Sequence, residues 1–331
     1  MKVGPTTLTL LRLATGLLLL CALFYFNLLD LSVLRTALHY PATLALATLI
    51  SLAAIPVAAF RWHLLLRSQG LYLRFVDTVR IAAISTFFST FLPGAVGGDI
   101  VRVVYIHRAS FGRRTGAYMS ILVDRLIAFA ALMIYGIVVT LLRPLGSYGW
   151  LEYALILVAF GFLTGIVIAI VLGDWVLRTM NSLFRGRWHK FAEFVEHVER
   201  ALQQYRLQWP VLLYSLAISL VVSGSQIGAI VVIGVFMHFG GLGAGEYAIA
   251  AAYGLMINNV PLTPGGLGVG ESAFASLCVA LEATTSNTPY GTIFLIFRCV
   301  LMLSALPGLF AYLIYPDRAK LLESVDTADG S

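Results

Sequence analysis

Hydrophobic residues occur in long, nearly unbroken runs along this chain, and short charged segments separate the runs. A helix needs roughly 20 mostly apolar residues to cross the hydrocarbon core of a bilayer. Six runs reach that length: Leu8–Leu29, Ala42–Leu66, Gly116–Leu142, Leu151–Gly173, Val211–Phe239 and Tyr290–Tyr315. The pattern predicts an all-α polytopic membrane protein with six spanning helices.

Two further apolar stretches, Phe75–His107 and Glu246–Glu282, are interrupted at their centres by prolines and glycines. Proline removes a backbone donor and glycine relaxes the backbone, so each string should break a helix. The break residues are Pro93, Gly94, Gly97 and Gly98 in the first stretch, and Pro264, Gly265, Gly266 and Gly268 in the second. We expect each stretch to form a re-entrant helical hairpin that enters and leaves the membrane on the same side.

The two breaks match each other in order. Pro-Gly opens each string, further glycines follow, and a carboxylate closes it, Asp99 in the first and Glu271 in the second. Each carboxylate is followed by an arginine in the next apolar span, Arg125 or Arg298. The match predicts an internal repeat, with repeat one at about residues 42–142 and repeat two at about 211–315.

Composition and charge agree with a membrane location. Apolar residues make up 60% of the chain and charged residues only 11%, a balance unlike that of soluble domains. The net charge of +6 comes from basic residues between the spans rather than along one soluble face, so no nucleic-acid partner is expected. These residues are Arg61, Arg67, Arg74 and Arg80 after the second span, Arg108, Arg113 and Arg114 before the third, Arg178, Arg185, Arg187, Lys190, Arg200 and Arg206 after the fourth, and Arg318 and Lys320 after the last.

The positive-inside rule assigns these basic loops, and with them both termini, to the cytoplasmic side of a bacterial inner membrane. The first hairpin then enters from the cytoplasm and the second from outside, which makes the repeat inverted. Residues 1–322 form one transmembrane domain in this interpretation. It includes a cytoplasmic amphipathic helix at about residues 183–206, and residues 323–331 form a disordered tail.

Five charged residues fall inside apolar segments, where each costs about 2.5–3.5 kcal/mol on insertion scales. They are Arg125, Arg298, Asp99, Glu271 and Asp124. In one interpretation the arginines hold an anionic group such as a phosphate, because a guanidinium forms a bidentate fork with phosphate oxygens. Helix N-terminal amides at Gly97, Gly98, Gly265 and Gly266 would add donors to this substrate site, and Asn259 would line a polar path to it.

The alternative is structural. Arg125 then pairs with Asp99, and Arg298 with Glu271, as clamps that lock each hairpin to its neighbouring helix. A clamp that opens and closes also serves as a transporter gate, so the two interpretations are compatible. Asp124 is either a proton-coupling site or, beside Arg125, a member of a structural pair.

Signals for catalysis are missing from the sequence. The histidines lack zinc-ligand spacing, and the chain has no nucleophile elbow and no nucleotide fingerprint. We therefore expect no metal, no cofactor and no enzymatic activity. Broken helices in inverted repeats are instead typical of secondary transporters.

Taken together, the motifs resemble the membrane domain of lysylphosphatidylglycerol synthase and related flippase-like integral membrane proteins, over most of the chain. The resemblance is carried by Phe91-Leu92-Pro93-Gly94, Gly97-Gly98-Asp99-Ile100-Val101-Arg102, Val123-Asp124-Arg125-Leu126, Pro261, Pro264-Gly265-Gly266-Leu267-Gly268-Val269-Gly270-Glu271 and Arg298. It implies movement of a charged or glycosylated lipid between leaflets. The sequence ends soon after the last span, without the aminoacyl-transfer domain of the full synthase, so lysyl-lipid synthesis is not expected.

Three functions stay open at this point. The first is a flippase-like transporter of an anionic or glycosylated (phospho)lipid, with membrane lipid as its substrate and enzymes of a lipid or glycan pathway as further partners. The second is a secondary transporter of a small soluble anion. The third is an accessory subunit or enzyme of polyprenyl-phosphate lipid metabolism, with Asp99 and Glu271 as metal or acid–base groups.

Overall fold

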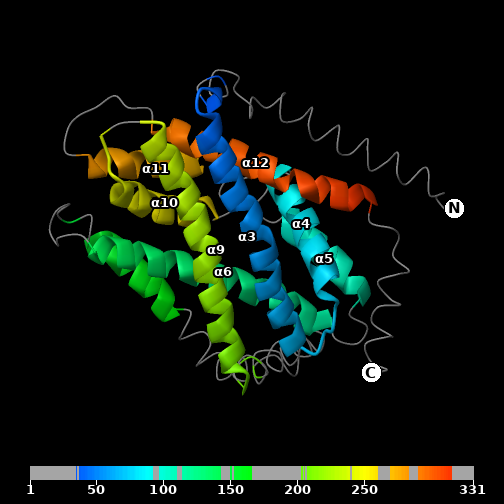
Figure 1. Cartoon of the computed structure of the whole chain (residues 1–331). Helices are drawn as coiled ribbons and strands as arrows, with labels where there is room; N and C mark the ends of the chain where they lie inside the picture. The colour runs from blue at the N-terminus through cyan, green and yellow to red at the C-terminus, as the bar shows by residue number, and fades with distance from the viewer. Residues whose placement is uncertain are drawn as a thin grey trace, which may run out of the picture. The chain divides into compact units, whose positions relative to one another are not determined.

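The computed structural model describes residues 35, 37–91, 97–109, 114–142, 150, 153–165, 203, 205, 207–238, 241–259, 269–282 and 290–314. These residues form helices joined by turns and contain no strand (Figure 1). The labelled helices are α3 (Pro41–Ser68), α4 (Phe75–Phe91), α5 (Gly97–Ala109), α6 (Arg114–Leu141), α9 (Trp209–Phe236), α10 (Ala244–Asn258), α11 (Val269–Leu281) and α12 (Gly291–Ile314). A shorter apolar helix, Tyr153–Gly165, follows α6.

Four helices are long and apolar enough to cross a membrane: α3, residues 115–141 of α6, α9 and α12. They coincide with four of the six predicted spans. The predicted span Leu151–Gly173 is described only as the helix Tyr153–Gly165, and Leu8–Leu29 lies outside the described residues. The all-helical membrane class is confirmed, whereas the count of six spans stays a prediction.

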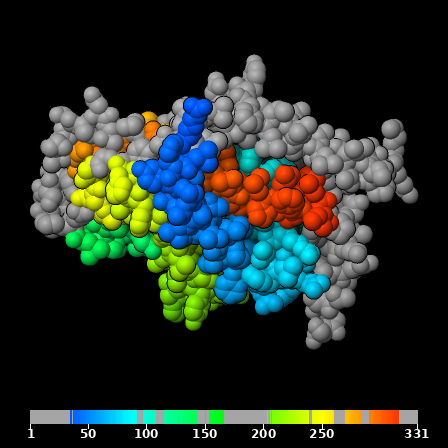
Figure 2. Space-filling view, turned by 45° about the horizontal axis from the view of Figure 1, so that its top comes forward, coloured from blue at the N-terminus to red at the C-terminus, as the bar shows by residue number. Residues whose placement is uncertain are grey.

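Large apolar side chains on these helices are exposed, as expected where lipid rather than water is the solvent. Leu46, Leu49 and Phe60 project from α3 with 44% or more of their surface exposed. Figure 2 shows that α3, in blue, lies open along one face of the molecule. The side chains that face inward are mostly aliphatic and aromatic, but they include the buried charges described below.

The second predicted hairpin is present as two helices, α10 and α11, that pack against each other. Gly254 of α10 makes the close approach possible, because a Cβ there would lie 3.2 Å from the Cβ of Phe274 on α11. The predicted break residues of this hairpin, Pro264, Gly265, Gly266 and Gly268, lie outside the described residues.

The first predicted hairpin is present as α4 and α5, which meet at Gly98. A Cβ at Gly98 would collide with the Ser89 hydroxyl and the Ser85 carbonyl, so only glycine fits there. The Ser85 hydroxyl donates to the Gly98 carbonyl at 2.9 Å. Pro93 and Gly94 lie outside the described residues, and re-entry from one side of the membrane stays a prediction.

The chain divides into two compact units whose segments alternate along the sequence. Unit 1 comprises residues 1–56, 79–101 and 224–317, and unit 2 comprises residues 57–78, 102–223 and 318–331. Unit 1 therefore contains segments of both predicted repeats. The inverted relation between the repeats stays a prediction. The predicted amphipathic helix at 183–206 and the tail at 323–331 lie outside the described residues, apart from residues 203 and 205.

Within unit 1, α12 packs closely against α4. A Cβ at Gly308 would collide with the carbonyl of Ala83, and Tyr312 meets Phe88 edge to face with ring centroids 5.2 Å apart. Small residues at such crossings let membrane helices approach closely.

Within unit 2, Leu65, Met119, Val123 and Tyr205 form a buried cluster. The Tyr205 hydroxyl donates to the Leu65 carbonyl at 3.2 Å, which holds the chain before α9 against the end of α3.

Candidate functional site

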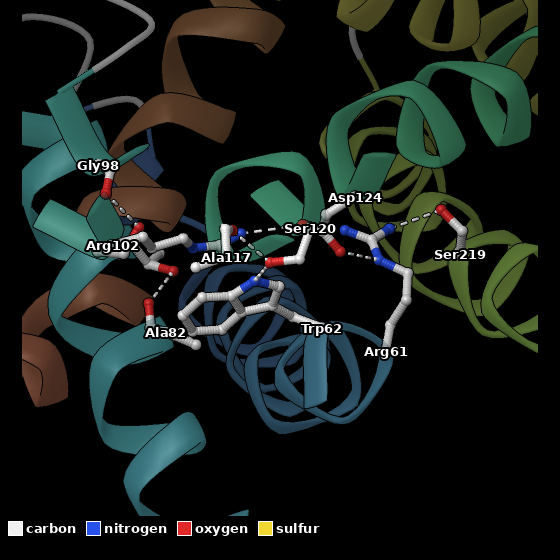
Figure 3. A network of polar contacts seen from close by, with 11 residues as sticks. Arg61, Trp62, Ala82, Gly98, Arg102, Ala117, Ser120, Asp124 and Ser219 are labelled. Carbon is white, nitrogen blue, oxygen red and sulfur yellow. Dashed lines mark hydrogen bonds and ion pairs between the residues drawn. The ribbon is translucent and has the colours of Figure 1, made fainter. Parts of the chain in front are cut away.

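A buried aspartate on α6 pairs with two arginines from two other helices of unit 2. Asp124 Oδ1 accepts from Arg61 Nε of α3 at 2.7 Å, and Oδ2 accepts from Arg102 Nη1 of α5 at 2.9 Å. Figure 3 shows both guanidiniums reaching toward this carboxylate. The Asp124 side chain is only 4% exposed, so water contributes little to its solvation. We call Arg61, Arg102 and Asp124 the Asp124 cluster.

The place of Arg61 removes one cation from the charge-based topology, and the topology itself stays a prediction. Arg61 was counted among the cytoplasmic loop cations that follow the second span, but it lies inside α3 and is buried. Its ion pair with Asp124 removes the need for an aqueous environment. Arg67, in the last turn of α3, is exposed and remains a topology marker.

Serines on α9 provide a polar side for this cluster. Ser219 Oγ accepts from Arg61 Nη1 at 2.6 Å and donates to the Ile127 carbonyl at 3.4 Å. Ser215, Ser219 and Ser223 are all buried and recur every four residues, which places them on one face of the helix. This spacing within an otherwise apolar span is the sequence signal that could have indicated Ser219, which was not among the predicted site residues.

The second arginine of the cluster lies over an aromatic ring. The Arg102 guanidinium carbon is 4.9 Å from the centre of the Trp62 ring, within the range of a cation–π interaction. Trp62 Nε1 donates to Ser120 Oγ at 3.3 Å, and Ser120 in turn donates to the Ala117 carbonyl at 2.7 Å. These bonds fix the indole beneath Arg102 (Figure 3).

The Asp124 cluster carries more positive than negative charge. Two guanidiniums share a single carboxylate, and Asp124 is the only carboxylate among the described residues that forms an ion pair with either of them. Arg102 Nε is buried and makes no hydrogen bond to the part of the chain that the structure describes. Asp124 is therefore paired with Arg61 and Arg102, and the choice between a proton-coupling and a structural role for it stays a prediction.

A second charged group lies in unit 1, where α10, α11 and α12 meet. Arg298 of α12 forms a two-point ion pair with Glu271 of α11: Nε donates to Oε1, and Nη2 donates to Oε2 at 3.2 Å. Nη2 also donates to Asn258 Oδ1 of α10 at 2.7 Å. The predicted clamp between Arg298 and Glu271 is confirmed as a contact. We call Arg298, Glu271 and Asn258 the Arg298 cluster.

Close packing at Gly270 holds the Arg298 cluster together. A Cβ at Gly270 would lie 2.5 Å from Asn258 Oδ1 and 2.7 Å from the Phe294 ring, so a larger residue would push Asn258 away. Asn259, the asparagine chosen from sequence, instead donates from Nδ2 to the Leu255 carbonyl of its own helix at 2.9 Å. Its neighbour Asn258 is the asparagine that reaches the arginine.

The other predicted site residues that the structure describes are not members of these two clusters. Gly97, Gly98 and Asp99 form the first turn of α5, and Arg125 lies next to Asp124 on α6, half-buried. The proposed pairing of Arg125 with Asp99 stays a prediction. On α4, the Thr86 and Thr90 hydroxyls donate to carbonyls of their own helix. Gly265 and Gly266 lie outside the described residues.

Among the described residues, no three His, Cys, Asp or Glu side chains gather into a group that could hold a metal ion. Both carboxylate oxygens of Glu271 accept hydrogen bonds from Arg298.

Comparison with known proteins supports one family. The model of the lysylphosphatidylglycerol synthase TM region matches residues 9–316, nearly the whole chain. Searches against curated proteins and against solved structures give no match. The match covers both charged clusters and both hairpins, and it indicates a function related to membrane lipid. The chain belongs to the lysylphosphatidylglycerol synthase transmembrane-region family.

Proposed function

We propose that this protein is a non-catalytic transporter that moves an anionic or glycosylated (phospho)lipid between the leaflets of a bacterial inner membrane. The family supports a lipid-related role. One structural observation supports transport: Arg298, inside an apolar helix, is held by residues on both sides of the break in the second hairpin.

The position of the partners gives this observation its weight. Asn258 is the last residue of α10, and Glu271 lies in the first turn of α11. Arg298 therefore ties together the two helix ends that flank residues 259–268. A change in the contacts of Arg298 would affect the end of α10 and the start of α11 together, which is the behaviour expected of a gate.

The chemistry of Arg298 suits exchange of one anion for another. A guanidinium presents a planar edge of two N–H donors, and carboxylate and phosphate both accept from such an edge in a bidentate way. In this structure Glu271 occupies the edge formed by Nε and Nη2. A lipid phosphate would compete for the same edge, and its binding would free Glu271 and the start of α11.

Exchange would keep the cost of moving charge through the membrane low. Arg298 would pair with Glu271 when no lipid is bound and with the lipid phosphate when lipid is bound. Its positive charge would therefore have an anionic partner in both states. The acyl chains would remain in the bilayer while the headgroup crosses. Opening and closing of the clamp would then couple headgroup binding to movement of the second hairpin.

Reconstitution in liposomes tests the proposal. The assay follows inter-leaflet transfer of fluorescent phosphatidylglycerol, with a membrane-impermeant quencher reporting the outer leaflet. Wild type, Arg298→Ala, Arg298→Lys and the exposed-residue control Arg67→Ala are compared at equal protein density. We expect transfer by wild type and the control, loss in Arg298→Ala, and partial activity in Arg298→Lys, which keeps the charge but not the planar fork.

Other results would point elsewhere. No transfer by folded wild type with phosphatidylglycerol, phosphatidic acid, a glycolipid and a polyprenyl phosphate would contradict the proposal and favour an accessory role. Uptake of radiolabelled inorganic phosphate without lipid transfer would favour the small-anion alternative.

A further inference from the structure

We infer that the Asp124 cluster of unit 2 is a separate oxyanion site that binds one phosphate group beside Arg102. None of its residues belongs to the Arg298 cluster, which lies in unit 1. The inference concerns binding alone, so it does not depend on the transport proposal.

Charge balance is the first argument. Arg61 and Asp124 neutralise each other, and Ser219 accepts a further hydrogen bond from Arg61. Arg102 then adds a positive charge without a second carboxylate among the described residues. Removing an ion from water costs several kcal/mol even after the surrounding protein relaxes. The Arg61–Asp124 pair is electrically neutral without Arg102. The additional positive charge of Arg102 would be stabilised by a bound anion.

The edge of Arg102 that carries Nε, which has no partner among the described residues, gives the second argument. Arg102 uses Nη1 for Asp124, while its Nε is buried and makes no hydrogen bond to the described residues. In Arg298 the edge that carries Nε and Nη2 is the one occupied by the Glu271 carboxylate. The molecule thus shows the same edge filled by an oxyanion in one cluster and without a described partner in the other.

Access and orientation give the third argument. The Arg102 side chain is 12% exposed, compared with 4% for Asp124, so the arginine is the more accessible of the two, although its Nε is itself buried. Trp62 covers one face of the guanidinium at 4.9 Å. With that face covered, a phosphate would bind in the guanidinium plane, where N–H groups bind phosphate oxygens in a bidentate way.

The ligand class is a phosphate oxyanion, and its source is either a lipid headgroup or free inorganic phosphate. Thermal unfolding of the purified protein in non-ionic detergent measures binding, because a ligand that binds only the folded state raises the unfolding temperature. The probes are inorganic phosphate, short-chain phosphatidic acid and, as a zwitterionic comparison, short-chain phosphatidylcholine.

Two variants and a matched control make the test specific. Arg102→Gln removes the edge that carries Nε but leaves the Arg61–Asp124 pair neutral, so the fold should be retained. Ser219→Asp adds a carboxylate beside Arg61. This carboxylate neutralises the one net positive charge of the Asp124 cluster without a ligand. Arg67→Gln removes an equal charge from an exposed position on α3.

We expect phosphatidic acid to stabilise wild type and Arg67→Gln, with at least tenfold weaker apparent affinity in Arg102→Gln. Ser219→Asp should raise the unfolding temperature of the ligand-free protein and weaken the response to phosphatidic acid. Stabilisation by inorganic phosphate as well would assign the site to phosphate in general, and stabilisation by the lipid alone would assign it to headgroups.

An equal response to every probe in wild type and Arg102→Gln would overturn the inference. If Arg102→Gln does not fold, an unchanged lipid response in Ser219→Asp would overturn it instead. A protein that binds through Arg102 but transfers no lipid would support this site while contradicting the transport proposal.

Discussion

Arg61 Nε lies 2.7 Å from Asp124 Oδ1, so one buried ion pair joins α3 to α6 across 63 positions of the sequence. Glu271 and Arg298 join α11 to α12 in the same manner. Each pair places an arginine and a carboxylate on different helices of one unit. Intramembrane charges are costly unless paired, and here the pairing also fixes which helix faces meet.

Replacing Asp124 with asparagine should be strongly destabilising. Asp124→Asn leaves two guanidiniums facing each other without a carboxylate, and breaking a buried pair from one side costs about 3–5 kcal/mol. The free energy of unfolding in mixed detergent micelles measures the effect. Val138→Ala, at an exposed position of α6, serves as the control. A change of less than about 1 kcal/mol in Asp124→Asn would mean that the cluster is solvated rather than buried.

Glu271 and Arg298 should be energetically coupled. Glu271→Gln and Arg298→Gln each leave one charge without its main partner, whereas the double variant removes both charges. We expect a coupling free energy of roughly 0.5–3 kcal/mol in a double-mutant cycle of unfolding free energies, with the double variant more stable than the two single effects predict. Additive effects would contradict the ion pair.

Two adjacent asparagines should differ in their importance. Asn258→Ala removes a hydrogen bond to the Arg298 guanidinium, and bonds to charged groups contribute about 1.5–3 kcal/mol. Asn259→Ala removes only a bond to the carbonyl of Leu255 and should cost about 1 kcal/mol or less. Thermal unfolding and lipid transfer are measured for both variants. A larger effect of Asn259→Ala on transfer would return the substrate role to that residue.

Gly98 should not tolerate a side chain. Gly98→Ala places a Cβ against the Ser89 hydroxyl and the Ser85 carbonyl, and such overpacking costs about 1–3 kcal/mol. Gly228→Ala is the matched control, because a Cβ at Gly228, inside α9, meets nothing within 4 Å. The control should be neutral or slightly stabilising, since alanine favours helix over glycine. Equal stability of the two variants would show that α4 and α5 are not closely packed.

Cysteine accessibility tests the predicted hairpin topology. Single cysteines at Tyr72, before α4, and at His107, in the last turn of α5, should react with a membrane-impermeant thiol reagent from the same side of the membrane. A cysteine at Trp150, after α6, should react from the opposite side. All three positions are exposed, and the native cysteines are first replaced by serine. Labelling of positions 72 and 107 from opposite sides would mean that α4 and α5 cross the membrane instead of re-entering.

The apolar pattern, together with the proline and glycine strings, predicted the helices that the structure describes. Long apolar runs gave α3, α6, α9 and α12 within a few residues, because length and hydropathy alone decide whether a helix can span a bilayer. The proline and glycine strings separated α4 from α5 and α10 from α11. These features are local, since they depend on backbone chemistry within a short window. The Glu271–Arg298 pair was also predicted, from charges placed at matching positions after each break.

The tertiary structure alone decided which polar groups meet in unit 2. The sequence showed that Asp124 needed a partner, but it gave Arg125 as the candidate, whereas the structure supplies Arg61 and Arg102 from α3 and α5. Likewise Asn258, and not Asn259, reaches Arg298. Neighbouring residues on a helix point about 100° apart, so the choice depends on how each helix is rotated against the others. That rotation is set by packing between distant segments, which a one-dimensional pattern does not contain.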